Sequence, residues 1–201
     1  METFRTQLLP QPVHLQLRYT DRILCMGSCF AEHIGQRLAS RKFRTSLNPF
    51  GILYNPISIC DNLQSLLDGD TYTEADLFEH NGRWNSFAHH GRFSGFSKEK
   101  VLATVQEESR KAKAALNSTN RILLTFGTAF VFRYKPTGRV VANCHKLAND
   151  QFTRKRLTVD EIVQVWRSLL HALKVVLPDV ELILTVSPVR HLRDGLIENQ
   201  R

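Results

Sequence analysis

The sequence predicts an α/β fold in which parallel strands form one sheet. Short apolar runs alternate with stretches of helical spacing along most of the chain. Two of the runs, at 22–26 and 121–126, are each followed directly by a glycine, as expected for buried strands that end at a sheet edge. Strands separated by helices are typical of parallel sheets with crossover connections.

The first part of the chain predicts a βαβα unit. Phe30, Ile34 and Leu38 recur every four residues, which favours a helix that follows the first strand directly. Pro56 suits the first position of a second helix. In order, we expect a strand at 22–26, a helix at 30–38, a strand at 43–47 and a helix at 57–67.

The stretch from 69 to 97 is predicted to be a long excursion without regular elements. It contains several glycines and polar residues and two adjacent histidines. Long loops of this kind often cover a functional site.

The remaining elements follow from the same patterns. Thr158 and Glu161 form a capping-box pattern at the start of a helix, and Pro136 and Gly138 favour a hairpin turn. We expect a helix at 98–116, a central buried strand at 121–126, an inserted hairpin of 130–134 and 139–142, a helix at 158–176 and a buried strand at 181–186.

Composition indicates one domain over residues 1–201. The chain is 42% hydrophobic and has 27 basic against 19 acidic residues, a net charge of +8. The basic residues are scattered, and no stripe of aromatic side chains runs between them, so we favour a basic surface over a nucleic-acid partner.

Cysteine usage and the N-terminus predict a cytoplasmic protein. The four cysteines form no CxxC pair, which indicates a reducing compartment. Residues 1–10 carry early charges and no long apolar run, so we expect no signal peptide. We also expect no membrane span, because no apolar stretch approaches the roughly 18 residues required.

The segment 23–31 carries the strongest functional signal. Its apolar run ends at Gly27, and Ser28 and Cys29 stand where a helix begins. A hydroxyl or thiol placed there lies at the carboxyl edge of the sheet, where unpaired N–H groups stabilise an anion. The alternative is that Ser28 is an ordinary helix N-cap.

Six blocks of the sequence, in the same order, resemble the GSCFA family, which is generally placed among the SGNH (GDSL-like) hydrolases. The resemblance covers nearly the whole chain from about residue 22, and the first block names the family. The blocks are 27–31, 48–56, 84–90, 125–129, 141–146 and 185–191 followed by Asp194 and Gly195.

This resemblance implies a three-layer α/β/α sandwich, SGNH-hydrolase-like and flavodoxin-like, and a covalent acyl-enzyme. When the SGNH pattern Gly-Asp-Ser is aligned without a gap, its nucleophile corresponds to Cys29. Enzymes of the superfamily generally use a serine, however, which favours Ser28. Both remain candidates. His191, which follows the last strand, is a candidate base or binds an anionic substrate group.

The resemblance also implies an oxyanion hole. Gly51 matches the glycine whose N–H donates to the oxyanion. The next block normally reads Gly-x-Asn, but here Gly127 and Thr128 are followed by Ala129, which has no side-chain donor. Thr128, Asn143 or Asn48 would then supply the missing donor.

Four further residues are candidates for the substrate pocket. They are His89, His90, Asn143 and His145. We expect no metal, because the spacing of these residues is not that of zinc ligands, and we expect no cofactor. SGNH domains carry a catalytic Asp-x-x-His near their C-terminus, which this sequence lacks, so we expect a chain without the C-terminal part of the domain.

The expected function is therefore that of a hydrolase or acyltransferase acting on an ester or acyl group of a small molecule or glycan. One alternative is a non-catalytic binding domain on the same scaffold, raised by Ala129. A basic nucleic-acid-binding module is a further alternative, supported by charge alone.

Overall fold

A four-stranded parallel sheet forms the centre of the protein. The computed structural model describes residues 15–187, so the predictions for residues 1–10 and for His191 lie outside the described residues. The strands are β1 (Arg22–Gly27), β2 (Arg44–Leu47), β5 (Arg121–Phe126) and β9 (Glu181–Val186). Their order is β2-β1-β5-β9 and every pairing is parallel, which confirms the predicted sheet.

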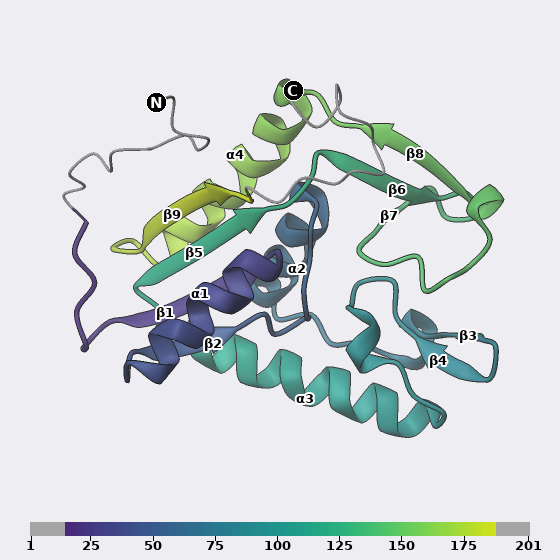
Figure 1. The fold of residues 1–201 in the computed structure, drawn as a ribbon, viewed down its shortest axis with the longest axis horizontal. Coiled ribbons are helices and arrows are strands. Elements are labelled where there is room, and N and C mark those ends of the chain that lie inside the picture. The colour runs from purple at the N-terminus through teal and green to yellow at the C-terminus, as the bar shows by residue number, and fades with distance from the viewer. Residues whose placement is uncertain (1–14, 188–201) are drawn as a thin grey trace, which may run out of the picture.

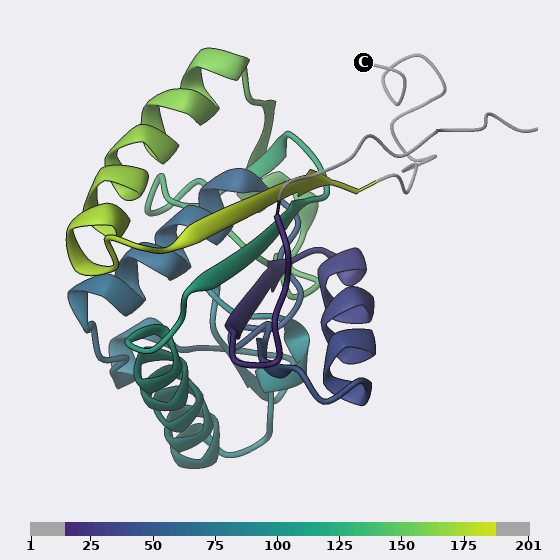
Figure 2. The same cartoon turned by 90° about the vertical axis from the view of Figure 1, so that its left-hand side faces the viewer.

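Helices cover both faces of this sheet, so the fold is a three-layer α/β/α sandwich, as predicted (Figure 1, Figure 2). The helix α1 (Cys29–Ser40) packs on one face through a small cluster that includes Ile23 and Ala31. The other face carries α2 (Pro56–Asp68), α3 (Lys98–Leu116) and α4 (Val159–Val176) over the larger core. Within residues 15–187, no helix is long and apolar enough to cross a membrane.

Local capping fixes where the helices begin. The Asn55 side chain accepts a hydrogen bond from the Ser58 N–H at 2.8 Å, and Pro56 follows it as the first helical residue. At the start of α4, Thr158 and Glu161 form the predicted capping box. These bonds satisfy N–H groups that the helices leave unpaired at their amino ends.

The excursion between α2 and α3 contains regular structure, and the prediction of none was wrong. β3 (Phe78–His80) pairs antiparallel with β4 (Arg83–Asn85), and short 3₁₀ turns stand at Glu74–Asp76 and Gly91–Phe93. Asn81 and Gly82 connect the strands with φ angles of 52° and 72°. An Asn-Gly pair with two positive φ angles is a strong hairpin signal, although the flanking runs are only three residues long.

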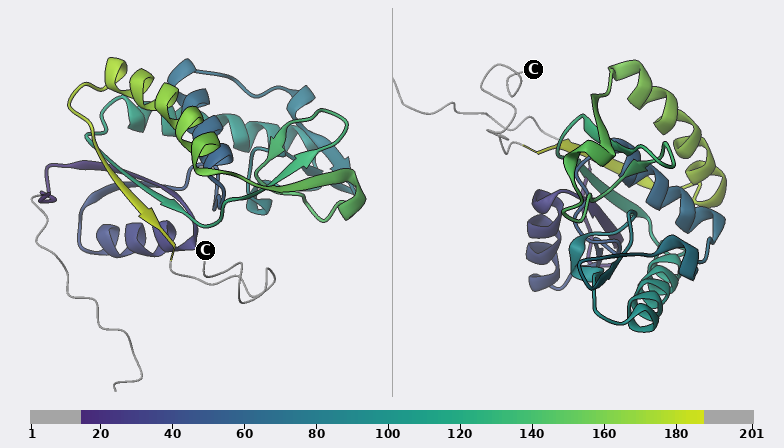
Figure 3. Two further views of the ribbon diagram at one scale, coloured as in Figure 1. Left: turned by 90° about the horizontal axis from the view of Figure 1, so that it is seen from above. Right: turned by 90° about the vertical axis from the view of Figure 1, so that its right-hand side faces the viewer.

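The predicted inserted hairpin is present and belongs to a second small sheet. β6 (Phe130–Tyr134) pairs antiparallel with β7 (Val140–Val141) and also with β8 (Phe152–Arg156), which the sequence analysis missed. Residues 153–156 of β8 are polar and exposed, so no hydrophobic alternation marks the strand. A 3₁₀ turn at Asn149–Gln151 precedes it. This sheet extends beyond the end of the main sheet (Figure 3).

The strand β9 is in place, but the prediction that it is buried was wrong. Leu184 is 52% exposed and Val186 is 77% exposed. The strand pairs only on its β5 side in the described residues, because it is the last strand of the sheet there. One side of the strand therefore lacks a packing partner from residues 15–187.

Candidate functional site

Three segments converge at the carboxyl edge of the main sheet, and they include the expected nucleophile pair and both expected glycines. Backbone hydrogen bonds hold them together. Ser28 N donates to Thr125 O at 3.0 Å, Leu53 N to Gly27 O at 2.9 Å and Gly127 N to Tyr54 O at 2.7 Å. The ends of β1 and β5 and the 48–54 loop therefore form one surface.

Ser28 and Cys29 have different environments in this surface. Ser28 is fully buried, and its hydroxyl accepts a hydrogen bond from the Phe30 N–H at 3.3 Å as the N-cap of α1. Cys29 is the first residue of α1 and is partly exposed. The neighbouring Tyr54 is an ionisable group whose pKa is raised by burial and by the proximity of Cys29. Of the two candidate nucleophiles, Cys29 is the one that solvent can reach.

Asn48 connects the site to a carboxylate that the sequence analysis did not consider. Its side-chain oxygen accepts from Gly27 N at 2.9 Å, and its Nδ2 donates to Glu32 Oε2 at 2.7 Å. Asn48 is buried and has a φ of 37°, a conformation that asparagine tolerates better than most residues. It fixes the Glu32 carboxylate one helical turn after Cys29.

The N–H groups expected to form an oxyanion hole are already paired. Gly51 N donates to Asn48 O at 2.7 Å, while Gly127 N and Thr128 N both donate to Tyr54 O. These glycines are needed for close packing instead. A Cβ on Gly51 would lie 2.2 Å from the Cβ of His90. The structure therefore does not offer the free Gly51 donor that the resemblance implies, because this N–H is hydrogen-bonded within its own turn.

His90 lies at the rim of this surface, directly over Gly51. Its Nδ1 accepts from Arg92 N at 3.2 Å, so the proton of the neutral ring is on Nε2. Burial and the Arg92 charge lower its pKa, while Glu32 acts in the opposite direction. A ring in this tautomer donates from Nε2 and does not accept a proton there.

His89 points the other way, into the core. It is 1% exposed, and its Nδ1 and the Ser86 hydroxyl are hydrogen-bonded at 2.9 Å. Its ring packs against Phe50, Tyr72 and Phe93. Burial lowers the pKa of His89 to about 3. The structure therefore separates the two adjacent histidines.

Asn143 and His145 pack against the excursion. His145 Nε2 donates to Ser86 O at 2.7 Å, and the His145 N–H donates to the Asn143 side chain at 2.9 Å. Burial lowers the pKa of His145. Neither residue has a contact with Ser28 or Cys29 among the interactions of the described residues. Residues 15–187 also contain no group of three His, Cys, Asp or Glu side chains suited to a metal ion.

Comparison with known proteins decides the family. A model of the GSCFA family matches residues 22–201. The chain belongs to the GSCFA family. Searches of curated proteins and of solved structures found no match for this GSCFA chain.

Three residues that the sequence analysis missed contribute to the GSCFA site. They are Glu32, Tyr54 and Arg92, whose guanidinium donates to Asn48 O at 2.7 Å. Glu32 follows Cys29 by three positions, so helical spacing alone would have placed both on one face. Arg92 had no such signal, because its contact with Asn48 spans 44 residues.

Replacing Asn48 with alanine is expected to destabilise the protein by about 1–3 kcal/mol. The substitution leaves the buried Gly27 N–H without its acceptor and releases Glu32. Asn81→Ala is the matched control, because Asn81 also has a positive φ but is exposed at a hairpin turn. Urea unfolding of both variants gives the comparison, and an equal loss at the two positions would show that the Asn48 side-chain bonds contribute nothing.

Proposed function

We propose that this protein is an acyl hydrolase or acyltransferase that works through a thioester on Cys29. The observation that carries the proposal is the partly exposed Cys29 thiol at the first position of α1, beside the fully buried Ser28. The first N–H groups of a helix have no intrahelical partner, and the helix dipole favours negative charge there. Both effects stabilise a thiolate and the oxyanion that forms when the thiolate attacks a carbonyl.

The other cysteines support this assignment by contrast. Burial raises the pKa values of Cys25 and Cys60 to about 12, so neither thiol is available as a thiolate at neutral pH. Cys144 is partly exposed like Cys29, but it lies at no helix N-terminus. Cys29 is thus the cysteine whose position favours nucleophilic attack.

In the proposed reaction, Cys29 Sγ attacks the acyl carbonyl carbon and the bond to the leaving group breaks. Water or another acceptor then takes the acyl group from the thioester. The proton acceptor we propose is His191, which follows β9 in the sequence. β9 ends beside β5 at the edge that carries Cys29.

The test is acylation by p-nitrophenyl acetate, followed by intact-mass and peptide analysis. We expect a rapid release of p-nitrophenol and an acetyl group on Cys29, both lost in Cys29→Ala. Cys144→Ala is the matched control and should behave as the unmodified chain. An acetyl group on Ser28, or equal reaction rates at Cys29 and Cys144, would contradict the proposal.

The second candidate function is a binding domain that has no acyl chemistry. It is favoured by the pairing of the Gly51, Gly127 and Thr128 N–H groups and by Ala129. The same assay separates the two functions, because a binding domain would give no stable acetyl adduct at Cys29.

A further inference from the structure

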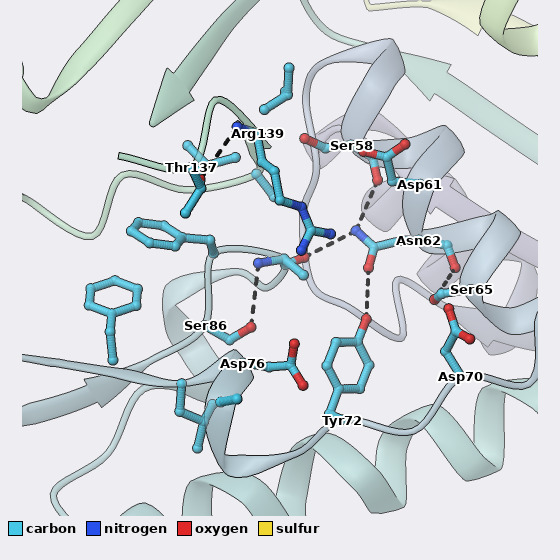
Figure 4. Close-up of a pocket in the computed structure, with 18 of the residues that line it drawn as sticks. Ser58, Asp61, Asn62, Ser65, Asp70, Tyr72, Asp76, Ser86, Thr137 and Arg139 are labelled. Carbon is cyan, nitrogen blue, oxygen red and sulfur yellow. Dashed lines mark hydrogen bonds between the residues drawn. The ribbon is translucent and has the colours of Figure 1, made fainter. Parts of the chain in front are cut away.

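A cavity lies apart from the candidate site, between α2, the excursion and the β6–β7 connection. Its volume is about 710 Å³, within the range of small-molecule sites. Neither Ser28, Cys29 nor the 48–54 loop lines it. Figure 4 shows Arg139 reaching from the β6–β7 connection toward the α2 residues Asp61 and Asn62.

The neutral polar groups of the cavity are largely occupied by one another. Asn62 donates from Nδ2 to Ser58 O and Ala88 O, and its Oδ1 accepts from the Tyr72 hydroxyl. Ser65 donates to Asn62 O, and Ser86 is bonded to His89. These groups hold the walls in place and have little capacity left for a ligand.

The cavity groups that remain available to bind a ligand are charged, and they include both negative and positive charges. Asp61, Asp70 and Arg139 line the cavity and are solvent-exposed, and no side-chain hydrogen bond or ion pair of theirs occurs within residues 15–187. Asp76 adds a third carboxylate, which accepts two bonds from Thr73. The cavity walls raise the pKa of Asp61 by displacing water, and the Arg139 charge opposes this shift.

The charges that line the cavity indicate which class of ligand it would bind. Three aspartates and one arginine give the cavity a negative excess, although the whole chain carries a charge of +8. A simple anion would be repelled by the carboxylates, and a simple cation would leave the guanidinium unpaired. A ligand that carries ammonium groups and one carboxylate can satisfy both signs, since Arg binds carboxylates in a bidentate manner.

We propose that this cavity binds a short peptide or amino acid that has free ammonium and carboxylate groups. Arg139 binds the carboxylate, and Asp61 and Asp70 bind the ammonium groups. The site is independent of Cys29 and goes beyond the acyl chemistry proposed above.

The test is calorimetric titration of the full chain with the dipeptide lysyl-alanine. We expect saturable binding in the millimolar range or tighter, weakened at least about 10-fold by Asp61→Asn and by Arg139→Gln. Asp68→Asn on the exposed end of α2 and Lys135→Gln near the hairpin turn are the matched controls, since neither residue lines the cavity. Both controls should bind as the unmodified chain does.

A second comparison assigns the carboxylate to Arg139. Lysyl-alanine amide, which lacks the carboxylate, should bind more weakly than the free acid to the unmodified chain but equally well to Arg139→Gln. Binding should also persist in Cys29→Ala, so a failure of the acyl chemistry would leave this result intact. The proposal would be overturned by the absence of saturable binding, or by equal binding of the acid and the amide to the unmodified chain. It would also be overturned if maltose, a ligand without charge, bound to the chain and both cavity variants retained that binding.

Discussion

Replacing Gly27 with alanine is expected to lower the free energy of unfolding by about 2–6 kcal/mol. Gly27 has a φ of 129°, which L side chains rarely adopt, and an added Cβ would lie 2.2 Å from the carbonyl oxygen of Thr125. That oxygen belongs to the backbone of β5, an inner strand of the sheet, and also accepts the Ser28 N–H, so it cannot move away cheaply. At the upper end of this range the folded state would be lost.

The control for this prediction is Gly69→Ala. Gly69 ends α2 with a φ of 76°, and nothing lies within 4 Å of its Cβ position. Only backbone strain remains there, which costs about 1–2 kcal/mol. Urea unfolding of the two variants measures the difference, and a Gly27 variant as stable as the Gly69 variant would show that β1 and β5 are not so closely spaced.

Acidification is expected to destabilise the protein through His89. The pKa of His89 is about 3 in the folded state and 6.5 when unperturbed, because burial disfavours the charged ring. Between these values the unfolded chain binds the proton and the folded chain does not. The stability is therefore complete above pH 6.5 and is lost as the pH falls toward 3. From pH 6.5 to about pH 4 this group alone accounts for about 3 kcal/mol.

The measurement is the free energy of unfolding as a function of pH for the unmodified chain, His89→Gln and His171→Gln. His89→Gln is expected to be less stable at neutral pH, since it loses the ring contacts, but its stability should fall less between pH 6.5 and about pH 4. His171 is exposed on α4, so its variant should keep the slope of the unmodified chain. The partly buried His145 contributes in the same direction in all three proteins. Parallel curves for His89→Gln and the unmodified chain would refute the prediction.

The sequence by itself determined the main sheet, the helices that cover it and the family. Local rules suffice for the sheet and its helices: apolar runs ending in glycine predicted β1 and β5, and capping residues such as Thr158 predicted a helix start. The family followed from the resemblance of six sequence blocks, not from local rules. The convergence of Ser28, Gly51 and Gly127 also followed from their order, because parallel strands end at one edge of the sheet.

Only the tertiary structure decided which groups in the site are available. Ser28 and Cys29 are adjacent in sequence, yet the hydroxyl is buried in a cap and the thiol is partly exposed. The Gly51 N–H is paired, and Asn48 joins Glu32 to Gly27. Burial and hydrogen-bond pairing depend on segments far apart in the chain, and a sequence pattern does not record them.

The same reason explains the features that the sequence analysis missed. The strand β8 has exposed polar residues and exists because β6 offers it a pairing edge. Asp61 and Arg139 both line the charged cavity, although the whole excursion, α3, β5 and β6 separate them in the sequence. The lining of the cavity by these two charges is set by the fold, since neither residue stands in a pattern that local periodicity or capping would reveal.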